Sequence, residues 1–167
     1  DRIFGKKMYN TSKWYRKGTG ALEGILDNLS LAAKSLQTQT TRITKHYHVT
    51  IAEWRLLRQI ENQVITQDAM ADALQLDTST LSRQLKNLTS KELVSKTAVG
   101  KDRRQLEYAL TATGHATLQH INSDYDALID AVFHYWPEDE QQMMKIMLNR
   151  LSRSLDRAEG ILEEDAD

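Results

Sequence analysis

Five polar side chains between residues 79 and 87 can hydrogen-bond a base edge or a phosphate, and no acid lies among them. Leu81, Leu85 and Leu88 are spaced four and three residues apart, which predicts an amphipathic helix with one apolar stripe. A rotation of about 100° per residue places the polar side chains away from that stripe. They are Ser79, Ser82, Arg83, Lys86 and Asn87. The chemistry that this face predicts is recognition of a nucleic acid.

A basic hairpin is expected directly after this helix. Two strand-like segments flank a tip that carries Lys101, Asp102, Arg103 and Arg104. Residues 78–110 hold seven basic and three acidic side chains, a net charge of +4, although the whole chain has a net charge of −1. A charged run by itself more often marks a solvated surface, but here it coincides with a helix followed by a hairpin. That combination is typical of a winged helix-turn-helix, and we expect the protein to bind double-stranded DNA.

The remaining composition narrows the function classes. The chain has no cysteine, which excludes disulfides, thiolate metal sites and cysteine-based oxidation sensing. It has no Gly-rich phosphate loop, nucleophile elbow or His-Glu zinc motif, so we expect neither an enzyme nor a bound cofactor. No stretch is apolar enough to span a membrane and no secretory signal is visible, so we expect a cytoplasmic protein without membrane contact.

Three helices are expected in the segment that leads to the hairpin. Thr50 and Glu53 form a capping-box pattern, which predicts a helix that runs through Ile60. A second helix is expected from Thr66 to about residue 74, and Asp77 is expected to cap the helix with the polar face. The side chains predicted to turn inward from the second helix are Ala69, Met70, Ala73 and Leu74.

Long helices are expected on both sides of this core, over residues 21–47 and from Thr111 to a stop before Pro137. Pro137 is expected in the first turn of a last helix, whose apolar residues between 144 and 162 are spaced 4, 3, 4, 3 and 4. This heptad seam suits a partner helix, although a role in the chain's own core explains it equally well. The side chains expected in a dimer interface are Leu22, Ile25, Leu29, Leu148, Leu151, Leu155 and Leu162.

Residues 1–20 form a basic segment with six basic side chains and one acid, a net charge of +5. Aromatic residues alternate with the basic ones. The segment is compatible with an arm on DNA, a strap across a dimer interface or, in part, an expression tag, and the sequence does not choose among them.

A motif around the hairpin adds a family resemblance. Asp102-Arg103-Arg104 is followed, after five residues, by Leu110-Thr111-Ala112-Thr113-Gly114. This resembles the wing signature of the MarR family of bacterial transcription regulators, which is D-x-R, five residues, then L-T-x-x-G. Ser79-Thr80-Leu81-Ser82-Arg83 is similar to the opening of that family's recognition helix, and Lys91-Glu92-Leu93-Val94 to its exit. The family usually has glycine where Glu92 stands, so we expect this helix to end without a glycine cap.

The resemblance, which covers residues 22–162, implies a mainly α-helical fold: a winged helix-turn-helix with a small β-hairpin wing and long N- and C-terminal dimerisation helices. Residues 48–110 would then form the DNA-binding domain, and residues 21–47 and 111–167 the helical dimerisation region. The implied function is a sequence-specific transcriptional regulator, commonly a repressor, that binds a pseudo-palindromic operator as a homodimer. The implied recognition-helix residues are Ser79, Thr80, Ser82, Arg83, Lys86 and Asn87.

The basic side chains have different expected roles on DNA. Arg83 is expected to contact a base, most naturally guanine. Arg104 is expected to enter a narrow minor groove, where the negative potential is strongest. Asp102 is expected to hold Arg103 or Arg104 in position through a charge-assisted hydrogen bond. The phosphate contacts are expected from Lys86, Lys101 and Arg103.

Members of the resembled family often lose DNA affinity when a small aromatic or phenolic effector binds between the dimerisation helices and the winged helix. By position, the candidates for such an effector pocket are Tyr47, His48, Trp54 and Arg58. The alternative interpretation is that Trp54 belongs to the core and Arg58 forms a surface salt bridge.

Two other functions compete with this one. A metal-responsive regulator of the same fold would use histidines, but His115 and His120 diverge by about 140° around a helix, so no metal site is predicted. A winged helix that docks an acidic protein through its basic wing is the alternative from a different class.

Overall fold

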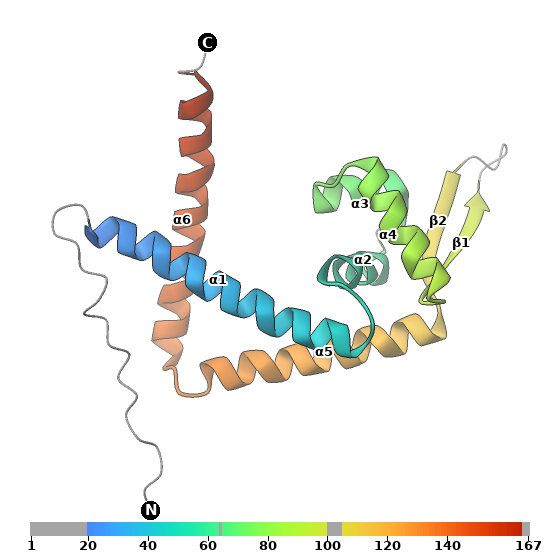
Figure 1. Cartoon of the computed structure of the whole chain (residues 1–167), viewed down its shortest axis with the longest axis horizontal. Helices are drawn as coiled ribbons and strands as arrows, with labels where there is room; N and C mark the ends of the chain where they lie inside the picture. Colours follow the sequence, from blue (N-terminus) through green and yellow to red (C-terminus); the bar gives the residue numbers. More distant parts are fainter. Residues whose placement is uncertain (1–19, 64, 100–104, 165–167) are drawn as a thin grey trace, which may run out of the picture. The chain divides into compact units, whose positions relative to one another are not determined.

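The computed structural model describes residues 20–63, 65–99 and 105–164, and within these ranges it is mainly α-helical with one antiparallel hairpin (Figure 1). This confirms the predicted fold class. The chain divides into two units, up to Ile121 and from Asn122 onward. The elements in chain order are α1 (Gly20–His46), α2 (Ile51–Glu61), α3 (Gln67–Leu74), α4 (Thr78–Ser90), β1 (Val94–Val99), β2 (Gln105–Leu110), α5 (Ala112–Phe133) and α6 (Glu138–Glu164).

The core of the first unit lies where α2, α3 and α4 pack together and against the hairpin (Figure 1). Its fully buried side chains are Leu56, Leu57, Met70, Leu81, Leu85, Leu88, Val94, Leu118 and Ile121. Among the four α3 residues predicted to turn inward, only Met70 is buried, Leu74 is half-buried, and Ala69 and Ala73 are exposed. The prediction was wrong for the two alanines, because α3 is only eight residues long and reaches α2 and α4 with a narrow stripe.

The helices begin at the residues that the capping patterns predicted. Thr50 and Glu53 form a complete capping box at the start of α2. Thr66 accepts a hydrogen bond from the Ala69 amide at the start of α3, and Asp77 accepts one from the Thr80 amide at the start of α4. These side chains satisfy amides that have no partner within the helix.

The C-terminal ends of the helices in this unit are followed by left-handed residues that are not glycine. Non-glycine residues with positive φ follow each of the first four helices: His48 (59°), Gln63 (64°), Gln75 (51°) and Glu92 (58°). After α4, the Leu93 amide donates to the Leu88 carbonyl and the Glu92 amide to the Thr89 carbonyl, which together form a Schellman motif. The helix ends without glycine, as expected, but the left-handed position is kept and Glu92 occupies it.

The hairpin is anchored to the loop before α3. Val94 pairs with Leu110 at its base and Val99 with Gln105 at its outer end. The Tyr108 amide donates to the Ile65 carbonyl at 3.0 Å, and Thr66 forms an isolated bridge with Glu107. The hairpin tip, with Lys101, Asp102, Arg103 and Arg104, lies outside the described residues.

The base of the hairpin also meets the first turn of α5. Thr111 caps α5 by accepting a hydrogen bond from the Gly114 amide at 2.9 Å, and the Thr111 amide donates to the Leu93 carbonyl. A Cβ on Gly114 would overlap that carbonyl oxygen. The glycine of the L-T-x-x-G motif is therefore required by the close approach of two backbones.

The second unit consists of the last part of α5, a short turn and α6. Pro137 lies directly before α6 rather than in its first turn, and its carbonyl accepts from the Gln141 amide. The first turn contains Glu138, Asp139 and Glu140, which suit the positive end of the helix dipole. No helix in the described ranges is long and apolar enough to cross a membrane.

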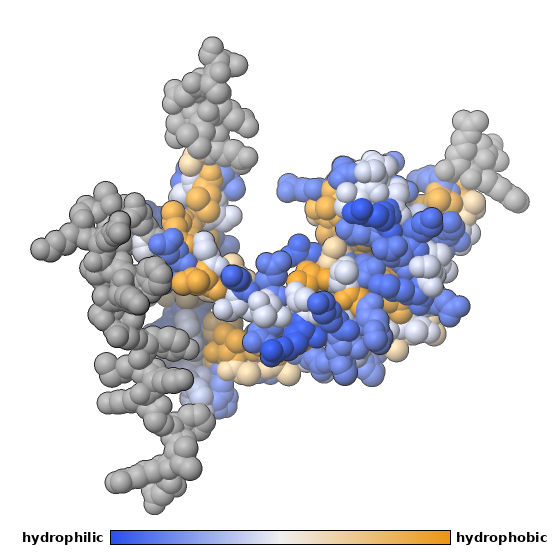
Figure 2. Space-filling model, in the orientation of Figure 1, coloured by the Kyte–Doolittle hydropathy of each residue, from blue (hydrophilic) through white to orange (hydrophobic). Residues whose placement is uncertain are grey.

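Apolar side chains are left uncovered along several helices of each unit, and Figure 2 shows apolar surface on the coloured part of α6. On α1, Ile25 is exposed and Leu29 is half-buried; on α6, Leu148 and Leu155 are exposed and Leu151 is half-buried. The remaining two residues predicted in the interface, Leu22 and Leu162, lie outside the residues whose side chains the structure describes.

Candidate nucleic-acid interface

The outer face of α4 is the exposed polar surface that the sequence predicted. Leu81, Leu85 and Leu88 point into the core. Thr80 is half-buried, and the remaining predicted contact residues are exposed: Ser79, Ser82, Arg83, Lys86 and Asn87. The helix therefore has one face that holds it in the core and one polar face open to solvent.

The N-terminus of this helix is organised by Asp77. One carboxylate oxygen accepts the Thr80 amide at 2.8 Å and also the Ser79 hydroxyl. These hydrogen bonds from Ser79 and Thr80 hold the pKa of Asp77 well below its ordinary value. Ser79 is thus part of the cap, and its donor hydrogen is engaged within the protein.

A residue that the sequence argument did not identify lies beside Ser82. The Gln67 side-chain amide donates to the Ser82 hydroxyl, which joins the first residue of α3 to the outer face of α4. Gln67 follows the Thr66 cap directly, so the sequence could predict its position at a helix start. Its contact with Ser82, fifteen positions later, depends on the angle between α3 and α4, which the sequence pattern does not predict.

Three predicted contact residues have side chains without a bonding partner among the described residues. In the part of the chain that the structure describes, the side chains of Arg83, Lys86 and Asn87 form no hydrogen bond or ion pair. Lys86 and Asn87 follow Arg83 by three and four residues, so they flank it on one face of the helix. A guanidinium, an ammonium and an amide on one face supply donors for phosphates and base edges, and the amide also supplies an acceptor.

The C-terminal end of α4 is fixed to the start of α2 by an ion pair. Lys91 Nζ lies 2.8 and 2.9 Å from the two carboxylate oxygens of Glu53. Glu53 is 2% exposed, and one of its oxygens also accepts the Thr50 amide at 2.7 Å. One buried carboxylate therefore completes a helix cap and positions the end of the polar helix.

The four residues predicted for an effector pocket have different environments. Trp54 is buried, in agreement with the core alternative, and the Arg58 guanidinium lies 5.4 Å from the centre of its ring. The Tyr47 ring meets the His120 ring edge-on, and exposed His48 occupies the left-handed position after α1. The effector pocket at these residues stays a prediction.

The described histidines and acids do not form a metal site. His115 and His120 both lie on α5, and His120 contacts Tyr47. Among the described residues, no three His, Asp or Glu side chains are grouped so that they could hold a metal ion.

Comparison with known proteins shows which family the chain is similar to. A model of the MarR family matches residues 48–105, which contain α2, α3, α4 and β1. The transcriptional regulator SarZ of Staphylococcus epidermidis is 25% identical over 128 residues, which cover 76% of this chain and 86% of SarZ. SarZ of Staphylococcus aureus is 28% identical over 120 residues, which cover 71% of this chain and 78% of that protein.

Solved structures share the fold. Staphylococcus aureus MarR in complex with salicylate and kanamycin has a TM-score of 0.72 at 20% identity, over 81% of this chain and 93% of that one. Staphylococcus aureus MepR in complex with DNA has a TM-score of 0.65 at 22% identity, over 76% of this chain and 93% of that one. By the family model over the winged helix and the similarity to SarZ, the chain is similar to the MarR family of winged-helix transcription regulators, and the solved structures share its fold.

Proposed function

We propose that this protein regulates transcription by binding double-stranded DNA through the outer face of α4. The observation that carries the proposal is the face of α4 with Arg83, Lys86 and Asn87, whose side chains are exposed and form no hydrogen bond or ion pair with the described residues. The opposite face of the same helix is fixed in the core, and its ends are held by Asp77 and by the Glu53–Lys91 pair. A helix that is held in place and carries available hydrogen-bond donors is suited to the major groove of DNA.

The side chains are assigned different roles. Arg83 reads a base, most naturally guanine, and Lys86 contacts phosphate. The wing residue Arg104 enters the neighbouring minor groove, with Asp102 as its positioning partner, while Lys101 and Arg103 contact phosphates. MepR, which shares the fold, has been solved in a complex with DNA, and this supports the assignment.

The active species is proposed to be a homodimer. The uncovered apolar side chains on α1 and α6 are the expected surface for a second copy, since large exposed apolar patches usually mark an interaction site. A two-fold dimer would bind a pseudo-palindromic operator with half-sites about one helical turn apart.

The regulatory outcome is proposed to be repression relieved by a small aromatic or phenolic effector. The related fold of MarR binds salicylate, an aromatic acid, which supports a ligand of this class. Tyr47, His48, Trp54 and Arg58 remain the proposed contacts. Such an effector must bind the DNA-competent and incompetent conformations with different affinity, because otherwise it cannot shift their populations.

The DNA-binding proposal is tested by titrating the protein against fluorescent duplexes that tile the DNA upstream of its own gene, at two salt concentrations. We expect saturable binding to one palindrome that survives competitor DNA. Arg83→Ala should weaken it by about 1–3 kcal/mol, because one base contact is lost. Arg153→Ala, which removes an exposed arginine from α6, is the matched control and should bind as the wild type does.

Weak and equal binding to every duplex would contradict the proposal and favour a winged helix that docks an acidic protein. Wild-type affinity of Arg104→Ala for the operator would reject the wing assignment alone. Operator affinity that changed only with added divalent metal would favour a metal-responsive regulator.

A further inference from the structure

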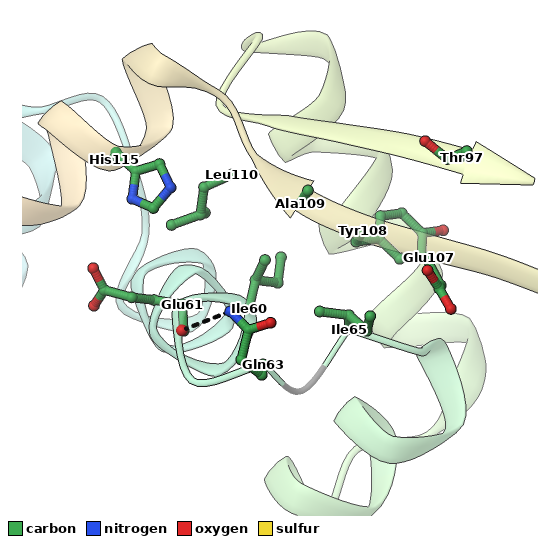
Figure 3. A pocket seen from close by; sticks show the side chains of 10 residues that line it. All are labelled: Ile60, Glu61, Gln63, Ile65, Thr97, Glu107, Tyr108, Ala109, Leu110 and His115. Carbon is green, nitrogen blue, oxygen red and sulfur yellow. Dashed lines mark hydrogen bonds between the residues drawn. The ribbon is translucent and has the colours of Figure 1, made fainter.

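A pocket of about 360 Å³ lies in the first unit, on the side of the hairpin next to α2 (Figure 3). Its walls come from the end of α2, the loop before α3, both hairpin strands and the first turn of α5. Ile60, Ile65 and Leu110 supply apolar surface in its middle. The volume falls in the range of small-molecule sites, which begins at about 300 Å³.

The charged residues of this pocket are acidic and stand at its two ends. Figure 3 shows Glu61 and His115 at one end and Glu107 at the other, with the apolar side chains between them. Among the residues that the structure describes, no lysine or arginine lines the pocket. Burial raises the pKa of the Tyr108 phenol above its ordinary value of 10.0, so the ring stays neutral at neutral pH and adds no charge.

Neither carboxylate is paired with a residue that the structure describes. In the ranges that the structure describes, the side chains of Glu61 and Glu107 form no hydrogen bond or ion pair. The bond drawn in Figure 3 joins the Gln63 side-chain amide to the Glu61 backbone carbonyl and leaves the carboxylate unused. Two free carboxylates beside apolar surface repel an anion and attract a cation that has an apolar body.

We propose that this pocket binds an organic cation, an amine with an apolar body, and that an α,ω-diamine engages both carboxylates. One ammonium group pairs with Glu61 and the other with Glu107, while the alkyl chain lies on Ile60, Ile65 and Leu110. The site is separate from Tyr47, His48, Trp54 and Arg58, and its ligand has the opposite charge to a phenolic acid.

The position of the pocket gives the ligand a structural effect. The Tyr108 amide and the Ile65 carbonyl bond across the pocket wall, and Thr66 pairs with Glu107 beside it. A diamine bound there contacts both the loop before α3 and strand β2. Binding should therefore stabilise the contact between the loop before α3 and strand β2, which joins the helix-turn-helix to the wing.

The inference is tested on the full chain without DNA, using 1,5-diaminopentane, pentylamine and pentanoate as probes. Amide chemical shifts of Gln63, Tyr108 and His115 should saturate with the diamine, saturate more weakly with the monoamine and stay unchanged with the acid. Glu61→Gln and Glu107→Gln should each weaken diamine binding about three- to tenfold, because one charged pair is lost. Glu140→Gln on α6 is the matched control and should leave the affinity unchanged.

Equal binding of amine and acid, absence of saturable shifts, or unchanged affinity in both pocket variants would each overturn the proposal. Both glutamates have solvent-accessible side chains, so their amide variants should fold, and equal melting temperatures would establish this. The assay is independent of the DNA-binding proposal, because no DNA is present.

Discussion

Glu92 adopts φ of 58° at the end of α4, a conformation that costs an L-residue other than glycine about 1–2 kcal/mol. Glu92→Gly should therefore raise the free energy of unfolding by about 1 kcal/mol, measured by urea denaturation. Asp72→Gly in α3, where the helix requires negative φ, is the control and should lower it by about 0.3 kcal/mol. A destabilised Glu92→Gly would show that the Glu92 side chain contributes more than its backbone strain.

Gly114 lies where a side chain does not fit. Gly114→Ala places a Cβ against the Leu93 carbonyl, so the junction between the hairpin and α5 must shift. We expect a loss of about 2 kcal/mol or more in unfolding free energy, while Thr113→Ala at the neighbouring exposed position stays within about 0.5 kcal/mol. Equal effects of the two changes would mean that this junction is not tightly packed.

Asp77 predicts a dependence of stability on pH. Its pKa in the folded protein lies below the ordinary value of 3.8, because it accepts hydrogen bonds from Ser79 and Thr80. The stabilisation is therefore present above about pH 4 and is lost as the pH falls through the lower, folded pKa. The stability advantage of the wild type over Asp77→Asn should shrink with acid in this window. A difference that does not change with pH would reject this role for the carboxylate.

For the helices, the sequence predicted the boundaries better than the backbone conformation after each helix. Thr50 and Asp77 are strong capping residues next to periodic apolar runs, and they cap α2 and α4. The left-handed positions after α1, α3 and α4 are His48, Gln75 and Glu92, which carry none of the signal that glycine would give. Local pattern could not reveal the left-handed backbone at these positions.

The sequence predicted the polar surface of α4, but it did not predict the side-chain interactions that hold α4 in place. Helical periodicity was enough to separate the polar face of α4 from its buried leucines. The Glu53–Lys91 pair joins residues 38 positions apart, and the Gln67–Ser82 bond crosses between helices. Both interactions depend on tertiary packing, and the local patterns of a single sequence do not predict contacts between distant residues.

The ion pair between α2 and α4 gives a prediction for these elements. Lys91→Met should lower the unfolding free energy by about 1–3 kcal/mol, because the buried Glu53 carboxylate loses its partner. In Glu53→Gln/Lys91→Met the loss should be smaller than the sum of the two single losses. Additive losses in this double-mutant cycle would mean that the two side chains do not interact energetically.

For the whole molecule, the uncovered apolar side chains predict a dimer. Leu148 is 43% exposed on the α6 seam, and a charge there would be buried against a second copy. Leu148→Asp should shift sedimentation equilibrium toward monomer and weaken operator binding with it. Asn149→Asp adds the same charge on an exposed neighbouring position away from the seam and should remain dimeric. A dimeric Leu148→Asp protein would place the interface elsewhere.

If the outer face of α4 reads DNA sequence, Arg83 must select a base, and titration against a base-substitution panel measures this selection. Wild type and Arg83→Ala are titrated against the operator and every single base-pair variant of it. We predict that Arg83→Ala loses discrimination at one position in each half-site and keeps it at the others. Uniform weakening across the panel with every preference retained would contradict the claim, because Arg83 would then contact only the backbone.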